Sequence, residues 1–140
     1  MSEVRKDIRF KKPHLTNLNF GINENFDIEK FEGFGKLKLK VKKSFKEDYN
    51  KEDLEGSSLV SLEVKIGESK EVYPFYAEIS VEAIFEWDNF NSEQVEQFLN
   101  VNAAAVLYSY CRTHISYVTA ASGLPSYSLP FYNFTDESIE

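Results

Sequence analysis

Phe75-Tyr-Ala-Glu-Ile-Ser-Val-Glu-Ala-Ile-Phe-Glu-Trp87 alternates apolar with mostly polar side chains over its whole length. Successive side chains of a β-strand point to opposite faces, so the odd-numbered residues share one face while Glu78 and Glu86 lie on the other. A strand with one packed face and one wet face is typical of an antiparallel sheet. The segment therefore predicts a long strand that buries one of its sides.

Three further strands are expected before this one. Lys36-Leu-Lys-Leu-Lys-Val-Lys42 alternates strictly between lysine and aliphatic residues, and residues 60–66 alternate in the same way. The polar residues 67–70 predict a turn into the long strand. Between Val4 and Phe26 the apolar residues at even positions are interrupted by Pro13, which predicts an interrupted edge strand followed by a crossover.

A long helix is expected from Asn91 to Gly123. Asn91 can cap its first turn while Gln94 completes a capping box, and Pro125 follows its end. Apolar residues between these ends recur at the three- and four-residue spacing of one helical face. They are Val95, Phe98, Leu99, Val106, Tyr110, Cys111, His114, Ile115 and Val118. Strands followed by one helix predict an α+β fold, with a four-stranded antiparallel sheet and a long C-terminal helix in a single domain over residues 1–140.

Aromatic side chains are unusually frequent, with 12 Phe, 8 Tyr and one Trp. A small core does not readily bury that much ring surface, so some rings are expected at an interface. The proline-punctuated segment Ser126–Phe134 carries several of them, and we expect it to be extended and exposed toward a partner surface.

Composition excludes several classes of function. The net charge of −7 disfavours binding to nucleic acid or to anionic membranes, and no apolar run is long enough to insert as a membrane-spanning helix. A single cysteine excludes an intrachain disulfide, and the N-terminal residues lack the apolar core of a signal peptide. These features predict a cytoplasmic protein.

No motif predicts an enzyme, a cofactor or a metal site. Cys111 and His114 could meet on the helix, but both lie in its apolar stripe and no acid or amide there could orient the imidazole. Residues 33–36 lack the spacing and the Ser or Thr of a phosphate loop. Residues 48–52 resemble a calcium loop, but Asp53 replaces its glycine. We interpret both segments as solvated turns.

The end of the chain carries a family resemblance. Val106-Leu-Tyr-Ser-Tyr-Cys-Arg-Thr-His-Ile115 and Leu124-Pro-Ser-Tyr-Ser-Leu-Pro-Phe-Tyr-Asn-Phe134 resemble the SecB family of export chaperones. Lys6-Asp-Ile-Arg-Phe10 is similar to the family's first strand, and Glu78-Ile79 with Phe85 is similar to its fourth. The three matches follow in the family's order.

The resemblance implies an ATP-independent holdase that binds unfolded polypeptides and needs no nucleotide. It also implies a homotetramer, assembled as a dimer of dimers, in which sheets pair through their first strands and the long helices lie between them. Clients of the family lie in grooves lined by aromatic and aliphatic side chains. The matching client-binding positions here are Phe20, Ile22, Phe26, Tyr127, Leu129, Phe131 and Tyr132.

The resemblance further implies a surface that contacts the translocase motor SecA. Asp7, Tyr76 and Glu78 occupy its positions, but Lys11 stands where the family has another acidic residue. A reversed charge weakens docking to a basic surface, and the chain ends where typical members continue. We therefore expect weak SecA binding, and either a role in export or a dedicated partner such as an antitoxin.

A carrier of small apolar ligands is the alternative. A long C-terminal helix closing an antiparallel sheet around a cavity would have the same order of strands and helix. Such a carrier would be a monomer or dimer and would bind lipophilic molecules stoichiometrically.

Overall fold

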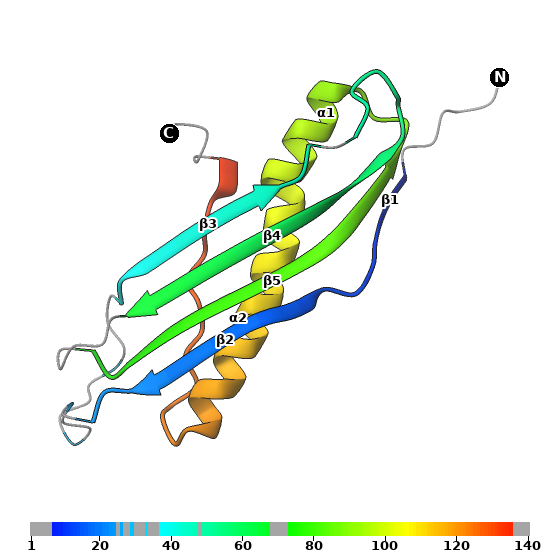
Figure 1. The fold of residues 1–140 in the computed structure, drawn as a ribbon. Coiled ribbons are helices and arrows are strands. Elements are labelled where there is room, and N and C mark those ends of the chain that lie inside the picture. The colour runs from blue at the N-terminus through cyan, green and yellow to red at the C-terminus, as the bar shows by residue number, and fades with distance from the viewer. Residues whose placement is uncertain are drawn as a thin grey trace.

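The computed structural model describes residues 7–24, 26, 29, 33, 37–47, 49–67 and 73–135. Its strands and helices are shown in Figure 1. They are β1 (Asp7–Phe10), β2 (His14–Ile22), β3 (Leu39–Phe45), β4 (Gly56–Gly67), β5 (Phe75–Asp88), α1 (Ser92–Gln97), η2 (Phe98–Ala103) and α2 (Ala104–Ala121). The order β1-β5-β4-β3, with β2 also beside β5, gives one sheet followed by one helical unit. The predicted α+β fold is confirmed, while most of the predicted turn at residues 67–70 lies outside the described residues.

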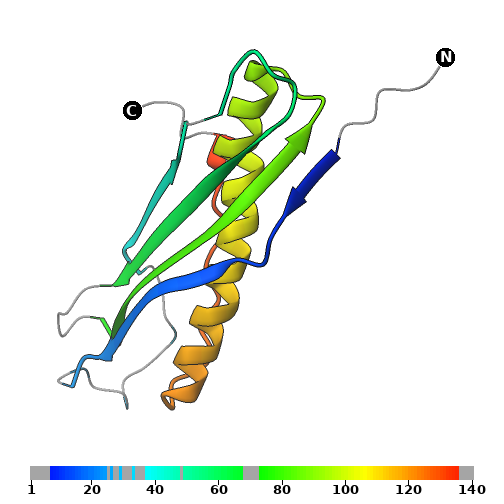
Figure 2. The same cartoon turned by 45° about the vertical axis from the view of Figure 1, so that its right-hand side comes forward.

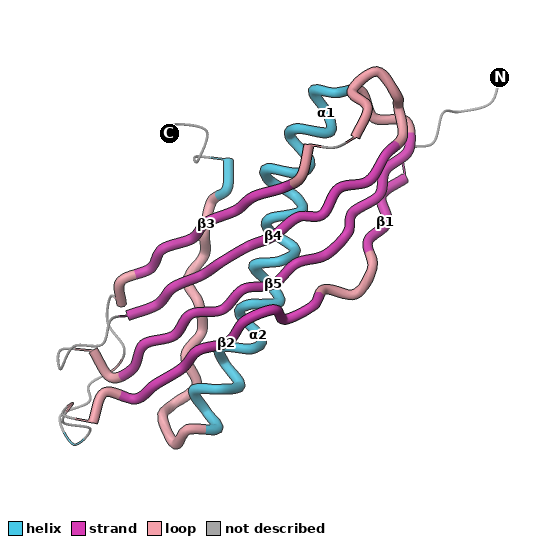
Figure 3. Tube along the Cα trace, in the orientation of Figure 1, coloured by secondary structure: helices cyan, strands magenta, loops and turns pink. Residues whose placement is uncertain are grey.

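β1 and β2 lie end to end along the same side of β5, and every pairing in the sheet is antiparallel. Asp7 is opposite Asp88 at one end of β5, and Ile22 is opposite Phe75 at the other. The break falls at residues 11–13, around Pro13, so the predicted interrupted edge strand is confirmed. The sheet therefore has five strands where four were predicted, although β1 and β2 form one discontinuous row (Figure 3), so that it is four rows wide.

One face of the sheet forms the core. All odd-numbered residues of β5 from Phe75 to Trp87 are buried, as are Val60, Leu62, Val64 and Ile66 of β4. The helix and the C-terminal segment both cover this face, and the opposite face of the sheet carries no layer of described residues (Figures 1 and 2). The alternation in the sequence therefore predicted the buried side of both strands correctly.

The helix runs without a break from Ser92 to Ala121, but η2 within it is π-helical. Asn91 and Gln94 form the predicted capping box. Beyond η2 the buried face differs from the predicted stripe. Leu107, Cys111, Ile115 and Thr119 are buried, whereas Val106, Tyr110, His114 and Val118 are half-buried. Cys111 and Ile115 belong to the predicted stripe, whereas Leu107 and Thr119 do not. A π-helical turn holds more residues than an α-helical one, so the face that follows it is turned toward these two residues.

The segment after the helix folds back against it, which corrects the expected exposure of part of the segment, although Phe131 is exposed as predicted. Tyr127, Leu129 and Phe134 are buried within the chain. The Thr119 hydroxyl accepts a hydrogen bond from the Tyr127 amide at 2.8 Å and donates to the Ile115 carbonyl at 2.8 Å. A periodic pattern does not show that an irregular segment packs on its own chain.

Three more side-chain hydrogen bonds hold this segment on the helix, two from helix residues and one from the segment itself. The Ser116 hydroxyl donates to the Tyr127 carbonyl at 3.0 Å, and the Ser126 hydroxyl donates back to the Ser116 carbonyl at 3.1 Å. The Tyr108 hydroxyl donates to the Pro130 carbonyl at 2.6 Å. The backbone groups of Tyr127 and Pro130 thus have hydrogen-bond partners on the helix. The segment can therefore lie on the core without secondary structure of its own.

Gly67 is the position where we expect a small substitution to have a large effect. Its φ is +68°, and a Cβ there would collide with the carbonyl oxygen of Phe75. Gly123 also has a positive φ, +93°, but a Cβ there meets nothing within 4 Å. Gly123→Ala is expected to lower the free energy of unfolding by about 1–2 kcal/mol. Gly67→Ala adds overpacking and is expected to cost at least about 1 kcal/mol more.

Urea unfolding followed by the fluorescence of the single tryptophan, Trp87, measures both changes. Equal losses for the two variants would show that the contact with Phe75 does not matter.

Thr119→Val tests the anchor of the C-terminal segment. Valine keeps the shape of threonine but leaves the buried Tyr127 amide without its acceptor, which is expected to cost about 1–3 kcal/mol of stability. The amide of Tyr127 should also exchange its hydrogen faster. The matched control is Thr113→Val, because the exposed Thr113 hydroxyl donates to the Ser109 carbonyl of its own helix. An unchanged Tyr127 exchange rate would contradict the anchoring role.

Candidate functional site

A groove runs between β3 and the start of the helix, with the end of the C-terminal segment as its third wall. We call it the β3 groove. Its volume is about 890 Å³. β3 contributes Val41 and Phe45, the helix contributes Glu96 and Val101, and the C-terminal segment contributes Phe134. The β3 groove therefore combines apolar and acidic walls that come from three distant parts of the sequence.

The Lys43 side chain extends from β3 and contacts the other two walls of the β3 groove. Its Nζ donates a hydrogen bond to the Asn100 carbonyl in η2 at 2.8 Å. The same Nζ lies 5.6 Å from the centre of the Phe134 ring, within the range of a cation–π interaction. One lysine thus connects the sheet edge, the π-helical segment and the C-terminal segment, so the groove has a defined width.

Phe131 is the most exposed large apolar side chain that the structure describes, at 87%. Its neighbours are held in place. Tyr132 lies 4.7 Å from Phe134 and 5.9 Å from Tyr108, measured between ring centres. Burial raises the pKa of the Tyr108 hydroxyl to about 12, so at neutral pH this group keeps the proton that it donates to Pro130. Phe131 is therefore presented to solvent by a well-anchored backbone.

The other predicted client-binding residues differ in exposure. Phe20 and Phe26 are half-buried, Ile22 is 45% exposed, Tyr132 is half-buried, and Tyr127 and Leu129 are buried. The Phe20 ring lies 5.6 Å from the Phe75 ring, which lies 5.6 Å from the Tyr127 ring. The fold thus brings two predicted segments together through Phe75. The alternation in the sequence predicted Phe75 only as a residue of the packed face, because its bridging role depends on tertiary contacts.

A row of exposed apolar side chains follows the β1–β2 edge of the sheet. Ile8, Phe10, Leu15, Leu18 and Ile22 are each between 40% and 45% exposed. Among the described strands, β1 and β2 pair only with β5, so their outer edge is open. An open edge flanked by apolar side chains is suited to pairing with another strand.

The predicted translocase-contact residues do not gather at one place within the chain. Tyr76 and Glu78 lie on the outward face near the start of β5. The backbone of Asp7 is opposite Asp88, near the other end of β5. Ten residues of strand separate Glu78 from Asp88, which corresponds to roughly 33 Å.

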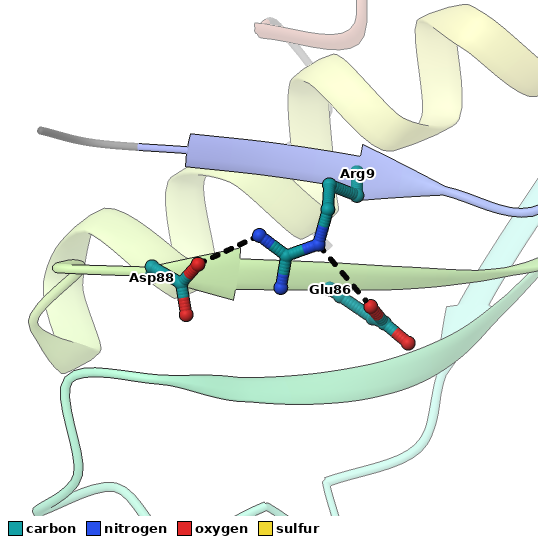
Figure 4. A network of polar contacts seen from close by, with 3 residues as sticks. All are labelled: Arg9, Glu86 and Asp88. Carbon is teal, nitrogen blue, oxygen red and sulfur yellow. Dashed lines mark hydrogen bonds and ion pairs between the residues drawn. The ribbon is translucent and has the colours of Figure 1, made fainter.

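Near Asp88 the outward face carries a small charge network, shown in Figure 4. Arg9 Nη1 lies 2.6 Å from Asp88 Oδ2, and Arg9 Nε lies 3.4 Å from Glu86 Oε2. The hydrogen bond from Arg9 lowers the pKa of Asp88. These acidic groups are thus already paired with a cation from β1, so the network ties the short strand β1 to β5.

The described residues show no arrangement for catalysis. Burial raises the pKa of the Cys111 thiol to about 12, so this thiol is not a nucleophile at neutral pH. In the part of the chain that the structure describes, no group of three or more His, Cys, Asp or Glu residues is arranged to hold a metal ion. Nor does any described helix have the length and apolar character needed to cross a membrane.

Comparisons with known proteins agree with this geometry. The family model described as preprotein translocase subunit SecB matches residues 5–136. An uncharacterized protein of Methanocaldococcus jannaschii is 29% identical over 128 residues, which cover 90% of this chain and 79% of that protein.

Several solved structures share the fold, and two of them serve as examples. The first is the SecB-like chaperone Rv1957 of Mycobacterium tuberculosis in complex with a ChAD peptide from the antitoxin HigA1, with a TM-score of 0.61, 14% identity and coverage of 89% of this chain and 90% of that chain. The second is a protein of unknown function from Streptococcus agalactiae, with a TM-score of 0.61, 16% identity and coverage of 91% and 100%. Because the family model matches residues 5–136 of this chain, the chain belongs to the SecB family of non-enzymatic chaperones.

Proposed function

We propose that this protein is an ATP-independent holdase, which binds extended apolar segments of unfolded polypeptides on the surface that includes Phe131 and the β3 groove. The observation that carries the proposal is the 87% exposure of Phe131 on an anchored backbone. A ring of this size contributes roughly 4–6 kcal/mol of gross apolar stabilisation when it is buried by a client. Ordering the client offsets much of that gain, so no single ring holds it.

The arrangement of the remaining predicted residues supports a broad binding surface. Ile22 is exposed and Phe20 is half-buried at one end of the sheet, where Phe75 and Tyr127 lie beneath them. Tyr132 is half-buried next to the β3 groove. Tyr127 and Leu129 line the interior behind these rings, so in our proposal they support the surface and do not contact the client directly. Apolar contacts of this kind need no fixed client sequence.

A dedicated client is part of the proposal. The fold is shared with a chaperone that was solved with an antitoxin peptide, and the same kind of client would suit the extended surface described here. Weak SecA docking fits the positive charge of Lys11 and the separation of Asp7 from Glu78 along β5. Service to one partner, in the cytoplasm, is therefore proposed ahead of general export.

We also propose that the protein assembles as a dimer of dimers. The open β1–β2 edge, with its row of exposed apolar side chains, would pair with the same edge of a second copy. Such a contact would extend the sheet across both subunits and remove the edge from solvent.

The alternative, a carrier of small apolar ligands, has less support. Side chains fill the space between sheet and helix, where Ile79, Leu107 and Leu129 are each at most 1% exposed. The β3 groove lies outside this interior and has acidic side chains in its wall. A ligand enclosed between sheet and helix would therefore have to displace packed residues.

Phe131→Ser is expected to weaken client binding without unfolding the protein. Removal of one exposed ring from a binding surface should lower the affinity about 5- to 30-fold, because the client loses the area that the ring would bury. The measurement is light scattering on a size-exclusion column, with the protein alone and with an excess of a reduced, unfolded polypeptide. Wild-type protein should elute at about four times the 16.2 kDa chain mass and carry the polypeptide with it.

Tyr117→Ser is the matched control, because Tyr117 is an aromatic residue that is 75% exposed on α2 and lies outside the β3 groove. It should bind the polypeptide as the wild type does. If both variants lost binding equally, the surface around Phe131 would have no special role. A monomer that ignores the polypeptide would contradict the holdase.

A further inference from the structure

The hydrogen bonds of β3 show which of its residues face its open edge. The Lys46 amide donates to the Leu59 carbonyl at 3.1 Å, and the Gly67 amide donates to the Lys38 carbonyl at 2.8 Å. Both pairs continue the β3–β4 register. In an antiparallel ladder, hydrogen-bonded and non-hydrogen-bonded pairs alternate. The even-numbered residues of β3 are therefore the ones bonded to β4.

The odd-numbered residues of β3 direct their backbone groups the other way. The N–H and C=O groups of Leu39, Val41 and Phe45 face away from β4, and β4 is the one described strand that pairs with β3. The side chains of these three residues point toward the helix layer and are half-buried. A strand added at this edge would thus find both backbone partners and, on its inner side, the β3 groove.

The outer side of the same edge is basic. Lys40 and Lys42 of β3, and Lys46 just beyond it, have exposed side chains. Within the described residues, none of these three lysines forms an ion pair. We call them the lysine row. It is a local concentration of positive charge in a chain whose net charge is −7.

We propose that the β3 edge binds an extended client segment as an added strand in which apolar side chains alternate with Asp or Glu. The apolar side chains would enter the β3 groove beside Val41, Phe45 and Phe134, and the acidic ones would lie along the lysine row. The proposal rests on the proposed holdase function and names the kind of client segment that this edge selects. Charge complementarity is its basis, because the acidic remainder of the chain disfavours such a segment elsewhere.

Edge lysines also have a simpler use, since they keep β-strands of neighbouring molecules from pairing. The two roles predict different results with peptides. Lysines that only guard the edge would leave it empty for any peptide, whereas a docking edge would bind one charge pattern and reject the opposite one.

The test uses three fluorescein-labelled peptides with a core as long as the 7 residues of β3. The first peptide alternates valine or tyrosine with glutamate, and the second has lysine in place of glutamate. The third has the same residues as the first, but its apolar residues and its glutamates are grouped into two separate blocks. Binding to the wild-type protein is followed by fluorescence anisotropy at low and high salt. The first peptide is expected to bind at least about tenfold more tightly than the others, and high salt should reduce the difference.

Two variants locate the binding. Lys40→Glu with Lys42→Glu should weaken the first peptide at least about tenfold and favour the second. Lys11→Glu with Lys12→Glu, which makes the same change in charge at exposed lysines near β1, should change binding less than about threefold. Val41→Pro removes an N–H that faces away from β4, so it should abolish docking while the β3–β4 ladder and the circular dichroism spectrum persist.

Amide hydrogen exchange supplies the structural readout. Binding of the first peptide should protect the amides of Leu39, Val41 and Phe45, which would not follow from electrostatic attraction alone. Equal affinity for all three peptides would overturn the inference. It would also be overturned if these amides were protected in the protein without peptide and if that protection increased with protein concentration, because a second copy would then occupy the edge. Failure to hold the unfolded polypeptide on the size-exclusion column would instead contradict the holdase function itself.

Discussion

The pairing of β5 on both of its sides is the constraint on which the rest of the molecule depends. β4 runs along one side, and β1 and β2 follow one another along the other. The inward residues of β5 from Phe75 to Trp87 are at most 4% exposed. A shift of the register by one residue would turn every one of these side chains to the outer face. The position of the apolar face is therefore fixed, and the later elements of the chain must cover it.

The helix alone is too narrow for that task. A helix with its side chains is about 10–12 Å wide, whereas strands in a sheet are about 4.8 Å apart, so four rows are wider than one helix. The C-terminal segment runs beside the helix (Figure 1) and covers the remaining strip with the buried Tyr127, Leu129 and Phe134. Phe131 does not contribute to that strip, because it points to solvent between the buried Leu129 and Phe134. The exposed ring is thus a consequence of how the core is closed.

Local patterns in the sequence predicted the local structure well. The alternation in residues 60–66 and 75–87 predicted two strands with their buried sides, and Asn91 with Gln94 predicted the start of the helix. The alternation in residues 36–42 predicted β3 three residues too early, because the strand runs from Leu39 to Phe45. Beyond η2 the predicted stripe was right for Cys111 and Ile115, which are buried. It missed Leu107 and Thr119, because a π-helical turn leaves no trace in a 3.6-residue period. The packing of Tyr127 and Leu129 was also missed, since it depends on hydroxyl groups of Ser116 and Thr119.

The candidate site was harder to predict than the fold, because its residues lie far apart along the chain. Phe131 belonged to the predicted client-binding set, whereas the β3 groove did not, because Val41, Glu96 and Phe134 come together only in the folded chain. The lysines of β3 were visible in the sequence as the polar side of a strand. Their position at an open edge became clear only from the strand order.

The two open edges of the sheet differ in a way that separates their uses. The β1–β2 edge carries exposed apolar side chains, and such an edge is favourable for a contact that stays buried once formed. The β3 edge carries exposed lysines, whose desolvation in a permanent interface would be costly without partners. Two copies that met through their β3 edges would also bring lysine rows of the same charge together. Self-association is therefore favoured at one edge and opposed at the other, which leaves β3 open to a segment of opposite charge from a different chain.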